Sequence, residues 1–261
     1  MSLAAWAPQT FASDGIAHCV YQRGEGPGVI VLPEIPGITP EVEAFAESLV
    51  DGGYAVWLVS LFGVDGAPRS PASVARTLFS VCVRREIALF SRGDASRLTP
   101  WLRALARHVH AEAGGVGVGL VGMCLTGGFA IATATEEAVR AAVMSQPSQP
   151  IGWTAGHRAD LGLDVDGEAL VAKRAAEGAL GVFALRFTGD VLVPRARFDA
   201  LRRCLGDALT CREIPSGRGQ PHGPAAHSVL TNDARPGTGE PTAEAHAAVL
   251  AFLARWLRTA P

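Results

Sequence analysis

The chain has 261 residues, of which 48% are hydrophobic and 18% charged, so it can bury a large core within one α/β domain. Its net charge is −2 with scattered basic residues, which argues against a nucleic-acid-binding surface. No apolar run reaches the roughly 18–20 residues of a membrane span, and the N-terminus lacks the segments of a signal peptide. We therefore expect a single domain over residues 1–261, cytoplasmic, monomeric or homodimeric, that binds neither nucleic acid nor membranes.

Short apolar runs alternate with helix-like stretches along the chain. The predicted strands are 28–32, 54–61, 116–121, 141–145, 182–187 and 208–214. The predicted helices are 40–51, 71–90, 99–113, 125–139, 168–179, 194–205 and 242–257. Continuous apolar strands between helices indicate an α/β fold with a mostly parallel central sheet and helices on both faces. Ligand sites in such sheets gather at the carboxyl ends of the strands.

The five cysteines are odd in number, widely spaced and without a C-x-x-C pair. This pattern argues against a disulfide framework and against a zinc site. Four of them are expected to be free buried thiols in a reducing cytosol: Cys19, Cys82, Cys204 and Cys211.

The fifth, Cys124, lies in the segment 119–128 (GLVGMCLTGG), where an apolar strand runs into a helix of small residues. This arrangement is typical of a nucleophile elbow. At a helix N-terminus, free amide groups and the helix dipole favour the thiolate, and the N–H of Leu125 is placed to stabilise an oxyanion. The alternative is a small buried cysteine beside a glycine-rich turn.

Two later residues complete a possible triad. Asp190 follows the strand 182–187 and precedes Val193-Pro194, whereas His227 follows the last strand. The order nucleophile, acid, histidine is the order of the α/β-hydrolase fold, in which the histidine is the general base and the aspartate orients it. The alternatives are an aspartate in an ordinary turn and a loop histidine, with His222 as a rival base.

A fourth candidate segment, 33–37 (PEIPG), follows the first predicted strand. The fold supplies its second oxyanion donor there, so the N–H of Ile35 is the candidate. Glu34 is expected close to the thiol, and the alternative is an ordinary solvated acid in a loop.

Together these residues resemble the dienelactone hydrolase family, from about Gly28 to Leu257. The family's G-x-C-x-G elbow matches residues 122–126, with Thr126 in place of the second glycine, and its other motifs match 33–37, Asp190 with Val193-Pro194, and His227-Ser228. The resemblance implies an α/β-hydrolase fold, attack by a cysteine on an ester or lactone carbonyl, and no metal or organic cofactor. It also implies a contact between Glu34 and Cys124 in the resting enzyme.

The predicted function is two-step acyl transfer that hydrolyses a small carboxylic ester or lactone. The arginines with which the muconate-lactone enzymes bind a substrate carboxylate have no counterparts at the matching positions, and Arg84 or Arg85 is a candidate substitute. The alternatives are a non-catalytic small-ligand-binding protein of the same fold and an enzyme that cleaves carbon–carbon or thioester bonds.

Overall fold

The computed structural model describes residues 3–83, 96–152 and 154–258. These residues form an eight-stranded sheet in the order β1-β2-β4-β3-β5-β6-β7-β8. The strands are β1 (Ala7–Ser13), β2 (Ile16–Arg23), β3 (Gly28–Leu32), β4 (Ala55–Ser60), β5 (Val118–Met123), β6 (Val139–Ser145), β7 (Gly181–Phe187) and β8 (Leu209–Ile214).

Strands β3 to β8 run parallel, and the antiparallel hairpin β1–β2 extends the sheet beyond β4. The helices are α1 (Pro40–Asp51), α2 (Pro71–Val83), α3 (Leu98–Ala113), α4 (Gly127–Thr133), α5 (Ala155–Ala159), α6 (Val165–Ala176), α7 (Arg195–Leu205) and α8 (Pro241–Leu257). The predicted α/β-hydrolase architecture with a mostly parallel sheet is therefore confirmed. No helix in the described ranges is long and apolar enough to span a membrane.

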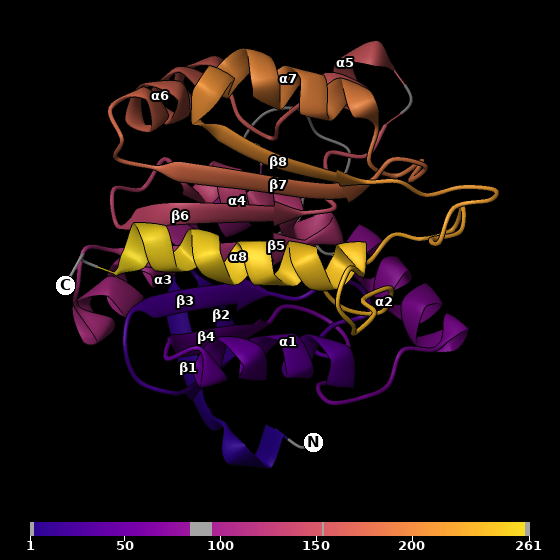
Figure 1. Cartoon of the computed structure of the whole chain (residues 1–261). Helices are drawn as coiled ribbons and strands as arrows, with labels where there is room; N and C mark the ends of the chain where they lie inside the picture. The colour runs from indigo at the N-terminus through magenta and orange to yellow at the C-terminus, as the bar shows by residue number, and fades with distance from the viewer. Residues whose placement is uncertain (1–2, 84–95, 153, 259–261) are drawn as a thin grey trace.

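Two apolar cores lie on the two faces of the sheet. Val29 and Val31 of β3 pack with α1 and α8, which Figure 1 shows side by side across one face. Their neighbours Ile30 and Leu32 pack on the opposite face with α3, α4, α6 and α7. Consecutive strand residues point to opposite faces, so a sheet covered on both sides needs an apolar residue at every position.

The N-terminal hairpin is an element that the sequence did not predict. Strands β1 and β2 meet in a tight turn at Asp14-Gly15, and both residues have positive φ values, 52° and 75°. An Asp-Gly pair is a strong signal for such a turn. Exposed and half-buried residues alternate along β1, but two of the three half-buried positions are polar, Gln9 and Ser13, so the sequence shows no apolar alternation and the strand was missed.

The predicted helix 125–139 is also wrong in length, since α4 ends at Thr133 and β6 already begins at Val139. The chain between them is held by the buried guanidinium of Arg174, which donates to the carbonyls of Ala134 and Glu136 among others. A side chain 35 or more residues away in sequence thus satisfies backbone groups that a longer helix would have paired internally.

Candidate active site

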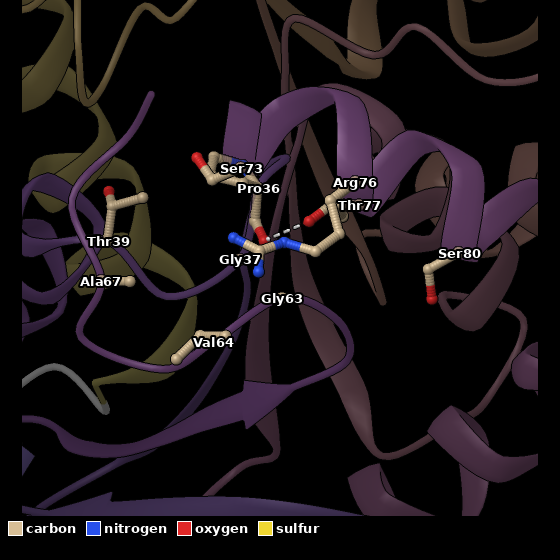
Figure 2. A pocket seen from close by; sticks show the side chains of 10 residues that line it. All are labelled: Pro36, Gly37, Thr39, Gly63, Val64, Ala67, Ser73, Arg76, Thr77 and Ser80. Atoms are coloured by element: carbon tan, nitrogen blue, oxygen red, sulfur yellow. Dashed lines mark hydrogen bonds between the residues drawn. The ribbon is translucent and has the colours of Figure 1, made fainter. Parts of the chain in front are cut away.

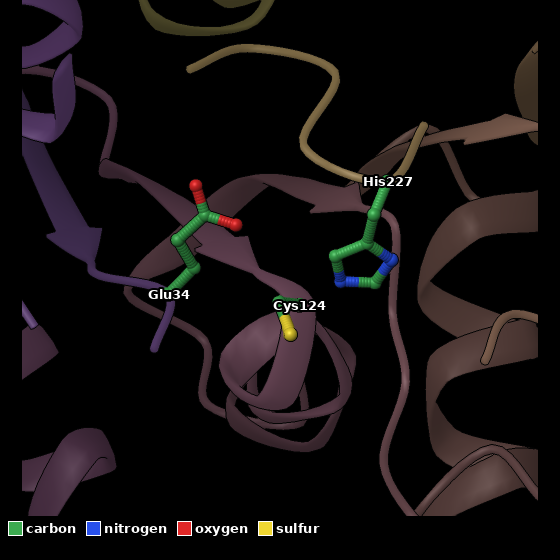
Figure 3. A group of neighbouring side chains, drawn as sticks. All are labelled: Glu34, Cys124 and His227. Carbon is green, nitrogen blue, oxygen red and sulfur yellow. The ribbon is translucent and has the colours of Figure 1, made fainter. Parts of the chain in front are cut away.

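The predicted site residues converge at the carboxyl edge of the parallel sheet. Glu34 follows β3, Cys124 follows β5, Asp190 follows β7, and His227 lies in the connection from β8 to α8. A carboxylate oxygen of Glu34, the sulfur of Cys124 and a ring nitrogen of His227 lie within 4.8 Å of one another (Figure 3). Three segments far apart in the sequence therefore bring an acid, a thiol and an imidazole to one point.

The turn at Cys124 has the geometry of a nucleophile elbow. Cys124 has a φ of 53°, in the left-handed region that is costly for a residue with a side chain. A Cβ at Gly122 would lie 2.3 Å from the carbonyl oxygen of Thr126, so only glycine fits there. The Thr126 hydroxyl accepts from the N–H of Met123 at 2.9 Å and lies 3.1 Å from the carbonyl oxygen of Leu32. Thr126 therefore ties the elbow to the end of β3.

Glycine usually destabilises a folded protein relative to alanine, but the positive φ at Cys124 predicts the opposite order there. Cys124→Gly should have a free energy of unfolding about 1 kcal/mol higher than Cys124→Ala, because alanine keeps the left-handed strain and glycine relieves it. Urea unfolding of both variants measures the difference. The matched pair at Cys211 in β8 should show the opposite order, since glycine weakens an ordinary strand position. If the glycine and alanine variants had the same order of stability at both positions, the left-handed strain at Cys124 would be refuted.

His227 is oriented by Asp190. The imidazole Nδ1 lies 2.6 Å from Oδ2 of the buried Asp190 carboxylate, whose Oδ1 accepts the N–H of Leu192 at 2.9 Å. The other ring nitrogen, Nε2, is buried and has no hydrogen-bond partner among the described residues. The arrangement leaves Nε2 free to exchange a proton with a group that comes within reach, and the closest nucleophile is the sulfur of Cys124.

The surroundings of His227 favour its protonated form. Burial alone would lower the pKa of the imidazole, but the hydrogen bond to Asp190 and the neighbouring sulfur of Cys124 outweigh it and raise the pKa to about 11. The imidazole is therefore positively charged at neutral pH, next to the sulfur of Cys124.

A pH dependence of stability follows from this raised pKa. The unfolded value is about 6.5, so His227 contributes stability that is fully present below about pH 6.5 and is lost as the pH rises toward 11. The difference in melting temperature between the wild type and His227→Gln should narrow as the pH is raised from neutral toward 11. Thermal unfolding of both proteins across this range measures it. If the difference in melting temperature between the two proteins stayed constant over this pH range, the positive charge of the His227 imidazole would be refuted.

The family resemblance implied a contact between Glu34 and Cys124, and a carboxylate oxygen of Glu34 lies within 4.8 Å of the sulfur, but the hydrogen bonds described for this carboxylate join it to other side chains. Oε2 accepts from Ser228 at 2.7 Å and from Gln146 Nε2 at 3.3 Å. Oε1 accepts from Asn232 at 3.1 Å and from the hydroxyl of Thr231. Four donors occupy the carboxylate, three of them from the segment that begins at His227. Glu34 is also almost fully buried, which excludes the alternative of a solvated loop acid.

The loop that carries His227 is fixed by a second acid. The backbone N–H groups of His227 and Ser228 both donate to Oδ2 of Asp233 at 2.8 Å. The rival His222 is buried elsewhere, paired with Glu240 at 2.8 Å. The pair between His222 and Glu240 therefore joins two parts of the connection from β8 to α8, and His222 is not available as a base.

Ser148 is a neighbour of the thiol that the sequence did not reveal. Its Oγ lies 3.5 Å from the sulfur of Cys124, and its N–H donates to the Cys124 carbonyl at 2.9 Å. Ser148 follows β6, whose polar continuation 145–149 (SQPSQ) reaches the same edge of the sheet. Polar residues directly after a predicted strand were the available signal for both Ser148 and Gln146.

A cavity of about 300 Å³ opens at the sulfur of Cys124. Its wall includes the two predicted oxyanion residues, Ile35 and Leu125, together with Ser148. The backbone amides proposed as oxyanion donors thus belong to residues that line the same cavity as the sulfur. Arg84 and Arg85 lie outside the described residues.

A second cavity of about 340 Å³ lies beside the segment that follows Ile35 (Figure 2). Its wall includes Pro36 and Gly37, and the buried hydroxyl of Thr77 in α2 donates to the Pro36 carbonyl at 3.2 Å. Cys124 does not line this second cavity but lines the first, so the candidate nucleophile belongs to the first cavity.

The comparisons with known proteins identify the family and agree with the fold. The sequence model of the dienelactone hydrolase family matches residues 16–161, more than half of the chain, so the protein belongs to the dienelactone hydrolase family. The matched region contains Glu34 and Cys124, whereas Asp190 and His227 lie beyond it. No curated protein matches the sequence significantly.

Several solved structures share the fold. A dienelactone hydrolase-like promiscuous phosphotriesterase from metagenomic libraries has a TM-score of 0.63 at 17% identity, covering 98% of this chain and 100% of its own. The dienelactone hydrolase from Anabaena variabilis has a TM-score of 0.58 at 16% identity, covering 96% and 99%. A cold-adapted esterase from an Arctic intertidal metagenomic library has a TM-score of 0.56 at 15% identity, covering 96% and 93%. At these identities the likeness establishes the fold alone.

Proposed function

We propose that the protein hydrolyses a carboxylic ester or lactone, with Cys124 as nucleophile, His227 as general acid and base, and Asp190 as the residue that orients the histidine. The observation that carries the proposal is the strained turn that presents the thiol beside a partly buried imidazole already paired with a carboxylate. A nucleophile, a base within reach and a third group that orients the base are the parts that covalent acyl transfer requires.

The proposed reaction has two steps. In the reactive form the proton of the Cys124 thiol resides on His227, so the thiolate sulfur attacks the carbonyl carbon while the N–H groups of Ile35 and Leu125 stabilise the oxyanion. The tetrahedral intermediate collapses to a thioester, and the alcohol leaves with a proton from the His227 imidazolium. Water then gives a proton to His227 and attacks the thioester, which releases the carboxylic acid and restores the Cys124 thiolate beside the His227 imidazolium.

Glu34 has a positioning role in this proposal. Its carboxylate accepts from Ser228, Thr231 and Asn232, so it holds the turn that carries the imidazole. The family resemblance instead assigned Glu34 to a direct contact with the thiol. Four donors on its two oxygens support the positioning role.

The same three side chains are also of the types that bind metal ions, because they offer a carboxylate, a thiol and an imidazole within 4.8 Å. A metal would have to displace hydrogen bonds from Glu34, whose two oxygens are already occupied. We therefore expect a chelator to leave ester hydrolysis unchanged, as measured by turnover after dialysis against EDTA. Loss of activity that zinc or another divalent ion restores would refute the metal-free mechanism.

A panel of p-nitrophenyl esters and lactones tests the proposed reaction. Turnover that depends on Cys124 supports it. The principal alternative, a ligand-binding protein without catalysis, predicts no turnover and slow alkylation of Cys124 by iodoacetamide below about pH 7, whereas a reactive thiolate is alkylated rapidly. Cleavage of thioesters or carbon–carbon bonds without ester hydrolysis would favour the other alternative. The cytoplasmic location, the single domain and the monomeric or homodimeric state stay predictions.

A further inference from the structure

Exposed apolar side chains gather around the cavity at Cys124. Leu78 of α2, together with Val191 and Leu192 after β7, line this cavity, and they are exposed by 41%, 86% and 55%. Large apolar side chains grouped at the wall of a cavity mark a surface that a ligand covers. Ile151 and Pro150 continue the apolar wall.

The same wall includes two arginines in different states. The guanidinium of Arg197 is buried and donates to four backbone carbonyls, those of Pro147, Pro150, His157 and Asp160, so its donors are used within the protein. Arg158 is exposed and forms no side-chain hydrogen bond or ion pair with any residue in the described ranges. The cavity therefore has on its wall a charge that no residue of the ranges 3–83, 96–152 and 154–258 neutralises through an ion pair.

We propose that this cavity selects esters whose acyl group is an apolar chain ending in a carboxylate, with the chain against Leu78, Val191 and Leu192 and the carboxylate at Arg158. The acyl side is favoured because the acyl group stays on the sulfur through both steps, whereas the alcohol departs after the first. The hydrolysis of such an ester rests on the proposed function, but its binding does not.

The apolar part of the proposal is tested with p-nitrophenyl acetate, butanoate and hexanoate. The value of kcat/KM should rise by up to about fourfold per added methylene, the ratio expected for burying a CH₂ group. Val191→Ser and Leu192→Ser should flatten this increase. Val165→Ser is the matched control, because Val165 is 84% exposed on α6 and does not line the cavity. If kcat/KM rose as steeply with acyl length in both cavity variants as in the wild type, the placement of the acyl chain against Val191 and Leu192 would be refuted.

The charged part is tested with the p-nitrophenyl half-ester of adipic acid against the hexanoate ester. The wild type should prefer the anionic ester by about two- to fivefold, the range for a solvent-exposed ion pair, and added salt should reduce the preference. Arg158→Gln should remove it. Arg255→Gln is the matched control, because Arg255 is exposed near the end of α8, where Leu257 packs against Gly119 at the opposite edge of the sheet. An unchanged preference in Arg158→Gln would overturn this part.

Binding to Cys124→Ala separates this proposal from the proposed function. Calorimetry should show that monomethyl adipate binds more tightly than methyl hexanoate, and that the additional Arg158→Gln substitution removes the difference. If binding follows this pattern while the wild type hydrolyses no ester, the specificity stands and the hydrolase proposal fails. If the wild type hydrolyses esters but the two ligands bind equally to Cys124→Ala, the hydrolase proposal stands and the specificity is refuted.

Discussion

Replacement of Cys124 by alanine is expected to lower kcat for a small ester by roughly 10⁴- to 10⁶-fold, the range seen when an enzyme loses its covalent nucleophile. The fold should survive, because Cys124 is only partly buried and alanine retains the Cβ and the backbone strain of the elbow. Steady-state hydrolysis of p-nitrophenyl acetate measures the loss, and circular dichroism with urea unfolding verifies the fold.

Cys211→Ala is the matched control for the loss of a thiol. Cys211 lies in β8, where burial raises the pKa of its thiol to about 11 and so keeps it protonated and unreactive at neutral pH. Turnover by this variant should equal that of the wild type. Turnover by Cys124→Ala at the wild-type rate, with the Cys211 variant also unchanged, would show that neither thiol is the nucleophile.

Replacement of Glu34 by glutamine is expected to lower the free energy of unfolding by about 3 kcal/mol and to lower kcat as well. The carboxylate is 1% exposed and accepts four hydrogen bonds. The glutamine amide brings hydrogens toward groups that are themselves donors, so at least one buried donor loses its partner. The turn that carries His227 then loses its anchor, which affects catalysis without any contact to the sulfur.

Glu43→Gln is the control for the loss of a buried carboxyl group. Glu43 of α1 is 2% exposed, but it accepts no hydrogen bond from any residue in the described ranges, and burial raises its pKa. Its replacement should leave the urea midpoint unchanged or raise it. If Glu34→Gln behaved in the same way, with normal stability and only an altered pH profile of Cys124 alkylation, the direct contact with the thiol would be the better account.

The positions of the candidate site residues at the strand ends could be predicted from the sequence, whereas parts of the surrounding structure could not. Cys124, Asp190 and His227 follow or approach parallel strands, and strand ends can be located from apolar runs bounded by turn residues. Parallel strands bring such positions to one edge irrespective of the loops between them, which is why the three residues meet. Their chemical roles remain predictions that the variants above test.

The polar network around Glu34 could not be predicted in the same way. Gln146 follows a predicted strand, but Ser228, Thr231 and Asn232 are ordinary loop residues in the sequence. Only the three-dimensional fold brings these three residues to Glu34, which lies 194 or more positions away in the chain. The family pattern placed Glu34 near the thiol, which is correct, but the donors that occupy it are particular to this chain. The N-terminal hairpin was missed for the different reason that an edge strand carries a weak apolar pattern.

The proposed thioester can be observed directly. In His227→Ala the water that would cleave the thioester has no general base, so incubation with p-nitrophenyl hexanoate should leave one hexanoyl group on the protein, detected as a mass increase and located by peptide mapping at Cys124. Hydroxylamine should remove it, as expected for a thioester. Hydrolysis by the wild type with no acyl group trapped on any variant, or an acyl group located on a residue other than Cys124, would contradict the covalent mechanism.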